Sequence, residues 1–507
     1  MTPSDELFKL IKCLTKSEKR FFKLFSSLQS GDKNYLKIFD YLVGQDKYDE
    51  YELKTKFSNE KLVHNLPSEK NNLYKLILKS LRAYHDGKSI NSILKKNINN
   101  IEILYNKGLY REFAKKISYA KKIAEKNEKY SYQLEIVNWE KKLAYISQKK
   151  ILLNIEKLID YEKYLMNQLT DLFDIDRIYS KTNILYCQKG LMQDQSSLII
   201  LNDIATPVIN NPEKFKLSNS IRVQSIFFYV SGLVELINQD FKKSSLLFNK
   251  TIDVLNNNVS IKLDSIDLYI KTFFQLFWSY IYNREFERAK RIIINIKSLK
   301  NKKELKFLNL SPSIFYYSYS QEIFLFNLYG RFEESVNLII ENEKKESLNY
   351  SSVDNEVKLL INYNKSYSYF GIGDFKKSLV YLNNILNNKQ KVRQDIHVLT
   401  RLLNIIIHYE LENFDFLQYL IKYYINYFNK IEEPYEIVNI SMKYFRKLSR
   451  IYNHFDKIEE LENFRTEIIK LPENNIFLLN FLNIEAWINS KITNLNFKKI
   501  IKESMAK

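Results

Sequence analysis

A short turn pattern that recurs along the chain limits the folds that this sequence can adopt. In each copy, a glycine, asparagine or other turn-forming residue precedes an aromatic residue that opens an apolar helical pattern, as in Gly373-Asp374-Phe375. The aromatic residues of successive copies are Tyr110, Phe241, Phe286, Phe332, Phe375, Phe414 and Phe455. Turns that separate helix after helix at a nearly fixed interval predict an array of helical hairpins.

The interval between copies supports this architecture. From Phe241 onward the aromatic residues lie 45, 46, 43, 39 and 41 residues apart. The gap of 131 residues before Phe241 is about three intervals long, which predicts two further hairpins, with helices at 130–147, 150–167 and 170–188. Several copies carry a small residue three positions after the aromatic, where it lets two helices approach closely: Ser244, Ala289, Ser335 and Ser378.

Few residues interrupt the helical patterns. The 507 residues include nine Gly and seven Pro, fewer than an α/β or all-β fold needs for its turns. One amphipathic hairpin cannot bury its apolar face alone, so each hairpin needs neighbours. We therefore expect an all-α protein with a basic N-terminal helical module at 1–90, helical repeats at 91–470 and capping helices at 471–507.

The copies resemble tetratricopeptide repeats. In that family's pattern, a Gly or polar turn leads to an aromatic residue and then to a small residue three positions later, as in Gly330, Phe332 and Ser335. Two features depart from the pattern: the interval exceeds the usual 34 residues, and the proline that ends each repeat is mostly missing. The resemblance implies a right-handed superhelical α-solenoid that binds a protein or peptide partner along its concave groove.

The resemblance also implies a set of groove residues. If the family's register holds, the first helix of each hairpin lines the concave face, and seven aromatic residues point toward the groove: Tyr229, Phe274, Trp278, Tyr317, Phe324, Tyr363 and Tyr367. Aromatic side chains can anchor a bound segment because they offer large contact areas and few rotors to freeze. The alternative is internal packing, since the chain holds 37 Tyr and 33 Phe.

Positive charge is concentrated in the first third of the chain. The formal net charge is +19, and residues 1–150 hold 31 Lys and Arg against 18 Asp and Glu. Thr2 and Thr15 each begin a capping-box pattern, which predicts two helix starts. Short helices followed by a longer helix with a polar-basic ladder resemble, at low specificity, a helix-turn-helix or winged-helix module over residues 30–90.

This region supplies a candidate basic surface. Its members are Lys19, Arg20, Lys23, Lys75, Lys79, Arg82, Lys115 and Lys122. Such a surface favours an acidic partner such as nucleic acid, whose phosphates would make binding steeply dependent on salt. The alternative is a helical cap with solvated lysines, because charged residues are normal on helix exteriors.

No arrangement of residues typical of catalysis or cofactor binding emerges. The five histidines lack metal-binding spacing, Cys13 and Cys187 lie far apart, and no glycine-rich loop precedes a Lys-Ser/Thr pair. We therefore expect no enzyme activity, cofactor or metal. The chain also lacks a basic-then-apolar leader and an apolar run of about 18 residues, so we expect a cytoplasmic protein without membrane insertion.

Two functions follow from these patterns. The first is a non-enzymatic scaffold or adaptor that binds a protein or peptide segment. The second is a nucleic-acid-binding regulator or RNA-associated factor that uses residues 16–122.

Overall fold

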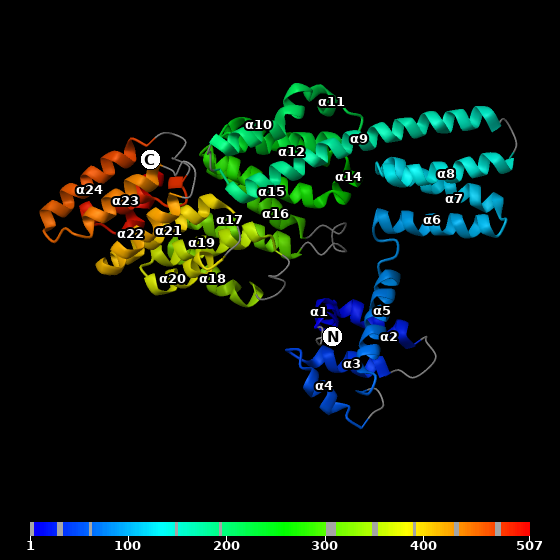
Figure 1. Cartoon of the computed structure of the whole chain (residues 1–507), viewed down its shortest axis with the longest axis horizontal. Helices are drawn as coiled ribbons and strands as arrows, with labels where there is room; N and C mark the ends of the chain where they lie inside the picture. The colour runs from blue at the N-terminus through cyan, green and yellow to red at the C-terminus, as the bar shows by residue number, and fades with distance from the viewer. Residues whose placement is uncertain are drawn as a thin grey trace. The chain divides into compact units, whose positions relative to one another are not determined.

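The chain is all-helical in the part that the computed structural model describes, with no strand in those ranges (Figure 1). The described ranges are 5–27, 34–59, 63–147, 151–191, 195–300, 311–346, 353–388, 392–429, 436–471 and 478–506. The all-α prediction is confirmed for these residues. Thr2, the first predicted capping residue, lies outside them.

The chain divides into two units, residues 1–160 and 161–507. The first unit contains α1 (Glu6–Cys13), α2 (Lys16–Ser27), α3 (Asn34–Gly44), α4 (Glu50–Lys56), α5 (Leu66–Tyr84), α6 (Ile90–Asn106), α7 (Tyr110–Lys126), α8 (Tyr130–Ser147) and the start of α9 (Ile151–Lys189). It holds two separate hydrophobic cores, one within residues 7–77 and one within residues 94–136. The break that the sequence indicated near residue 90 lies between these two cores.

Local signals account for the start of α2. The Thr15 hydroxyl accepts a hydrogen bond from the Glu18 N–H at 3.2 Å, and the Glu18 carboxylate accepts one from the Thr15 N–H at 2.8 Å. This reciprocal pair is the capping box that the sequence predicted. The described residues of this module contain helices alone, so no β-hairpin wing is among them.

The second unit is built from helices that pair along the chain. They are the rest of α9, α10 (Gln195–Asn210), α11 (Pro212–Lys216), α12 (Ile221–Ile237), α13 (Phe241–Asn256), α14 (Val259–Asp264), α15 (Ile266–Tyr282), α16 (Phe286–Leu299), α17 (Ser311–Leu328), α18 (Phe332–Glu346), α19 (Asn355–Gly371), α20 (Phe375–Leu386), α21 (Gln394–Glu410), α22 (Phe414–Phe428), α23 (Glu436–Leu448), α24 (His454–Ile469), α26 (Ile484–Thr493) and α27 (Phe497–Ala506). Partners within a hairpin pack together, and α13, α17 and α19 also contact the first helix of the next hairpin.

Seven of the turns between successive helices share one backbone geometry. At the α19–α20 turn, the Gly373 N–H donates to the Phe370 carbonyl and the Asp374 N–H to the Tyr369 carbonyl, both at 2.9 Å. This is a Schellman motif, which needs one residue in the left-handed region. The same pair of bonds recurs wherever that residue is Gly108, Glu128, Gln239, Arg284, Gly330, Gly373 or Glu412.

The shared geometry explains the turn pattern of the sequence. Asp374, one position after the left-handed residue, also accepts the Lys377 N–H at 3.1 Å and so caps α20. The aromatic residue then occupies the first helical position, as Phe375 does. The recurring sequence pattern thus marks a C-cap joined directly to an N-cap.

Arg284→Gly should stabilise the second unit by about 1 kcal/mol, because Arg284 has φ +58° and only glycine adopts this region without cost. Gly373→Ala should destabilise it by a similar amount, because Gly373 has φ +82°, where alanine is strained. A Cβ at Gly373 would meet no other atom within 4 Å, so a steric clash does not add to this cost. Urea unfolding measures both changes. Arg284→Ala is the control, and a stabilisation equal to that of Arg284→Gly would contradict the explanation by backbone strain.

The small residues that follow the aromatics are fully buried, as expected: Ser244, Ala289, Ser335 and Ser378. Serine hydroxyls of this set also link helices. Ser378 donates to the Ser366 carbonyl at 2.7 Å, and Ser244 donates to the Gly232 carbonyl at 2.8 Å. A Cβ at Gly232 would lie 2.9 Å from the Phe248 ring, so this crossing requires glycine.

Two details differ from the sequence-based expectation. The helices predicted at 150–167 and 170–188 form one helix, α9, because no Gly or Pro interrupts residues 151–189. Phe455 does not follow a turn of the recurring type: residues 449–453, all described, contain no residue with positive φ. Its side chain is 81% exposed, so it packs unlike the buried Phe332.

Candidate binding surfaces

The predicted basic residues of α2 and α5 belong to helices that pack against each other. The Phe21 and Tyr84 rings lie 5.2 Å apart, and His85 Nε2 lies 2.8 Å from a Glu18 carboxylate oxygen. Lys19 is half-buried, and the other basic residues of these helices are exposed: Arg20, Lys23, Lys75, Lys79 and Arg82. Lys23 pairs with Asp40 at 2.6 Å, which partly neutralises that part of the surface.

The basic face of α5 is the clearest part of this surface. Leu73, Ile77 and Ser80 are buried on one side of the helix, whereas Lys75 and Lys79 are exposed on another. Lys115 and Lys122 are also exposed, but they lie on α7, which packs against α6 and α8 in the other core of the unit. The main contacts therefore join α2 with α5 in one core and α7 with α6 and α8 in the other.

A polar cluster fixes α5 against the start of α4. Lys70 Nζ lies 2.8 Å from a Glu50 carboxylate oxygen and 2.9 Å from the Tyr48 hydroxyl. Partial burial acts to raise the pKa of Glu50, but hydrogen bonds from Lys70, Tyr48 and Lys54 outweigh it and lower the pKa to about 2. This cluster orients the helix that carries the basic face.

Replacing Glu50 should give a destabilisation that depends on pH. Since its folded pKa of about 2 lies below the ordinary value, Glu50 stabilises the fold fully above pH ~4.3 and loses this effect as pH falls toward 2. Glu50→Gln should cost about 1–3 kcal/mol at pH 7 and almost nothing at pH 2. Urea unfolding across this pH range measures the difference, and a constant difference would contradict the assigned role.

The seven predicted groove residues form what we call the aromatic row: Tyr229, Phe274, Trp278, Tyr317, Phe324, Tyr363 and Tyr367. Neighbouring rings of the row touch, with centroids 4.7 Å apart for Phe274 and Tyr317 and 4.8 Å for Trp278 and Phe324. Every member is at least 93% buried. In this structure the side chains of the aromatic row are therefore packed inside the protein, which was the alternative to a groove.

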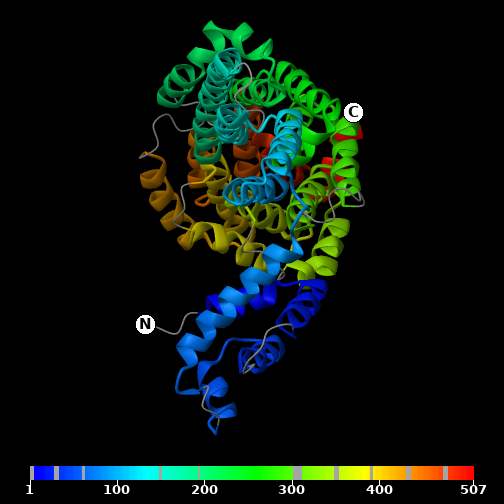
Figure 2. The same ribbon diagram turned by 90° about the vertical axis from the view of Figure 1, so that its right-hand side faces the viewer.

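The C-terminal segment contacts four members of the aromatic row: Trp278, Phe324, Tyr363 and Tyr367. In Figure 2 the red helices near the C-terminus lie among the green and yellow helices of the second unit. The Phe481 ring lies 5.2 Å from Trp278, 5.0 Å from Phe324 and 6.2 Å from Tyr363. The Tyr363 hydroxyl donates to the Phe481 carbonyl, and the Asn483 N–H donates to the Tyr367 hydroxyl, both at 3.2 Å. The row thus holds a short stretch of chain by both ring packing and backbone hydrogen bonds.

The covering segment differs from the simple end cap that was predicted at 471–507. Trp487 is buried against Tyr409 and Phe445 and donates to Glu410 at 2.6 Å, as a cap on the last hairpins would. Residues 478–483 reach back to Trp278, about 200 positions earlier in the sequence. No local sequence pattern predicts this contact.

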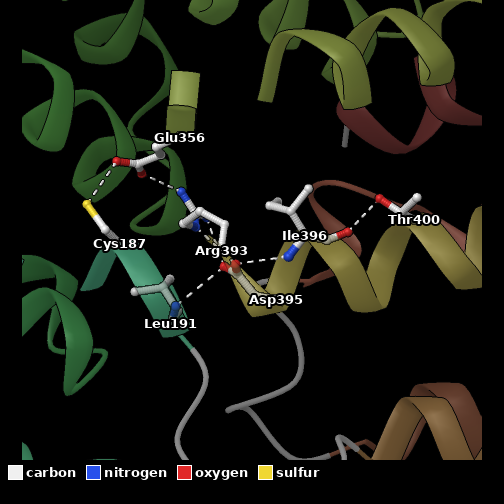
Figure 3. Close-up of polar contacts among 7 residues, drawn as sticks. All are labelled: Cys187, Leu191, Glu356, Arg393, Asp395, Ile396 and Thr400. Carbon is white, nitrogen blue, oxygen red and sulfur yellow. Dashed lines mark hydrogen bonds and ion pairs between the residues drawn. The ribbon is translucent and has the colours of Figure 1, made fainter. Parts of the chain in front are cut away.

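A buried ion cluster that sequence reasoning missed joins α9 to α19 and α21 (Figure 3). Arg393 donates to Asp395 at 2.9 and 2.8 Å and to Glu356 at 2.8 Å. The side chains of Arg393 and Asp395 are each 1% exposed, so water does not screen this pair. The Arg393 N–H also donates to the Cys187 carbonyl at 2.7 Å.

The cluster is built for packing rather than for nucleophilic chemistry. Burial raises the pKa of the Cys187 thiol to about 12, and the Glu356 carboxylate adds to this effect. A thiol with such a pKa stays protonated near neutral pH and is a poor nucleophile. Gly190 permits the approach of α9, because a Cβ there would lie 2.2 Å from the Asp395 carboxylate.

In the part of the chain that the structure describes, no group of three or more His, Cys, Asp or Glu residues is placed to hold a metal ion. Among the same described residues, no helix has both the length and the apolar character needed to cross a membrane.

No protein-family model matches the chain. The sequence is similar to Protein Ycf2 of Physcomitrium patens, with 24% identity over 377 residues. The aligned part covers 71% of this chain and 14% of that protein, so the chain spans a small fraction of this relative's length. The similarity carries no activity over to the chain.

Proposed function

We propose that the chain is a non-enzymatic scaffold whose hairpins form a tetratricopeptide-like superhelix and bind a segment of a protein partner. One observation carries this proposal: the aromatic row already holds a stretch of polypeptide. Phe481 inserts among Trp278, Phe324 and Tyr363. The Tyr363 hydroxyl donates a hydrogen bond to the Phe481 carbonyl, and the Tyr367 hydroxyl accepts one from the Asn483 N–H. Aromatic anchors combined with hydrogen bonds to a backbone suit peptide recognition.

The binding of a protein partner is tested by purifying the full chain from its native cells, with and without nuclease, followed by mass spectrometry. The proposal predicts the same retained proteins in both samples, and cross-links from at least one of them to residues 161–507. Loss of all retained proteins on nuclease treatment would contradict it. A cytoplasmic location belongs to the same proposal and is tested by fractionation of those cells.

A second candidate function is nucleic-acid binding by the N-terminal module, favoured by the exposed basic face of α5. Lys75→Glu with Lys79→Glu should reduce the affinity for duplex DNA or RNA at least tenfold and lower the salt slope by about 2. Retardation assays at several salt concentrations measure both. Lys290→Glu with Lys376→Glu makes the same charge change at exposed sites of the second unit. Equal effects of the two pairs would contradict a site on α5.

A further inference from the structure

The last helix, α27, has the pattern of a short basic amphipathic helix. Ile501 is 2% exposed, and Phe497 and Met505 pack against the same core, whereas Lys499 and Lys502 are exposed. A helix of ten residues is marginal in water by itself. The helical state of α27 therefore depends on the surface that receives it.

That surface lies where two hairpin turns meet, and we call it the α27 seat: Gly330, Phe332, Glu333, Tyr367 and Phe370. The Phe497 ring lies 5.5 Å from Phe370, 5.8 Å from Phe332 and 6.4 Å from Tyr367. These three rings make an apolar slot for one aromatic side chain. Since Tyr367 also belongs to the aromatic row, the slot continues the surface that holds Phe481.

Gly330 shapes the seat as well as its own turn. A Cβ at this position would lie 3.0 Å from the Lys498 carbonyl oxygen and 3.2 Å from Ile501. The equivalent turn residue Gly373 has open space where its Cβ would be. Both glycines serve the backbone of their turns, but only Gly330 also makes room for the backbone of α27.

The charge of the seat complements that of the helix. Glu333, in the first turn of α18, pairs with Lys498. The hydrogen bond from Lys498 lowers the pKa of Glu333, and Lys502 contributes to the shift. The seat therefore selects an aromatic residue followed directly by a lysine, with an aliphatic residue four positions after the aromatic.

Most apolar side chains of α27 are less deeply buried than those of the segment before it. Phe481 and Trp487 are buried in the core, whereas Phe497, Ile500 and Met505 remain partly exposed. A hollow of about 330 Å³ lies between the start of α27, the 370–375 turn and the end of α26. Elements with few buried contacts open at lower free energy than the core.

We propose that the α27 seat is the docking site for a basic amphipathic helix of a protein partner, and that α27 occupies it in the free chain until the partner displaces it. This inference rests on the proposed scaffold function and names the partner class. The partner helix carries an aromatic residue, a lysine directly after it and an aliphatic residue four positions after the aromatic. Residues 494–507 of this chain provide the model ligand.

The test measures binding of a fluorescent peptide of residues 494–507 to the full-length chain by anisotropy. Ile501→Asp places a charge in the buried position of α27 and leaves the seat unchanged. The peptide should bind this variant at least tenfold more tightly than the wild type. Hydrogen exchange should show α27 unprotected in the variant while residues 484–493 stay protected. Equal peptide binding to both chains, or loss of protection throughout 478–506, would overturn the proposal.

A matched pair of glycine substitutions assigns the binding to the seat. In the Ile501→Asp chain, Gly330→Ala should weaken peptide binding at least tenfold, whereas Gly373→Ala should change it less than twofold. Equal effects of the two substitutions would place the peptide elsewhere and contradict the proposal.

Capture from native cells separates this inference from the proposed function. Stronger retention of a protein by Ile501→Asp than by wild type supports the seat only if the peptide of residues 494–507 competes with that protein. Equal retention by both chains keeps the scaffold function and overturns the seat.

Discussion

Arg393→Met should destabilise the second unit by about 3–5 kcal/mol, the largest effect that we expect from one polar substitution. The guanidinium is fully buried between Asp395 and Glu356, so its removal leaves the buried Asp395 carboxylate and the largely buried Glu356 carboxylate without their cation. Burial already raises the pKa of Glu356, and loss of Arg393 removes the charge that opposes this effect. Urea unfolding of the full chain, followed by far-ultraviolet circular dichroism, measures the change.

The control for Arg393 is an exposed ion pair. Arg288 lies 2.7 Å from Glu285, but its side chain is 64% exposed. Arg288→Met should therefore cost less than about 1 kcal/mol. Similar effects of Arg393→Met and Arg288→Met would mean that the buried cluster does not join α9 to α19 and α21 in solution.

Trp278→Ala should destabilise the same unit by about 3–5 kcal/mol. Trp278 is fully buried, and its ring contacts Phe324, Tyr282 and Phe481. Its removal leaves a cavity that neighbouring helices cannot fill without shifting. Phe455→Ala is the control, because its side chain is 81% exposed, and should change stability by less than about 0.5 kcal/mol. A cost below about 1 kcal/mol for Trp278→Ala would contradict its place in the core.

The hairpins could be predicted from the sequence because each turn carries its own local signal. Phe286 at the first helical position and Ala289 three positions later mark the turn where the left-handed residue is Arg284 rather than glycine. Where that residue is Glu412, Asn413 and Phe414 still mark the turn. The basic face of α5 was likewise readable from helical spacing. Local chemistry dictates both features, so no knowledge of the tertiary structure was needed.

Whether the aromatic row is exposed or covered could not be predicted, because the residues that cover it lie far away in the sequence. Spacing placed Trp278 and Tyr363 on one set of helices, but the residue that covers them, Phe481, lies more than 100 positions later. The ion cluster is equally non-local. Arg393 donates hydrogen bonds to Glu356 and to the Cys187 carbonyl near the end of α9. The sequence around each of these three residues resembles that of an ordinary helix end.

A double-mutant cycle between Trp278 and Phe481 tests most directly the central claim that the C-terminal segment lies on the aromatic row. Unfolding free energies are measured for the wild type, Trp278→Ala, Phe481→Ala and the double variant. Because the two rings touch, the account predicts a coupling energy of about 0.5–3 kcal/mol. Additive costs, with coupling below about 0.3 kcal/mol, would show that Phe481 does not rest on Trp278 and would contradict the account.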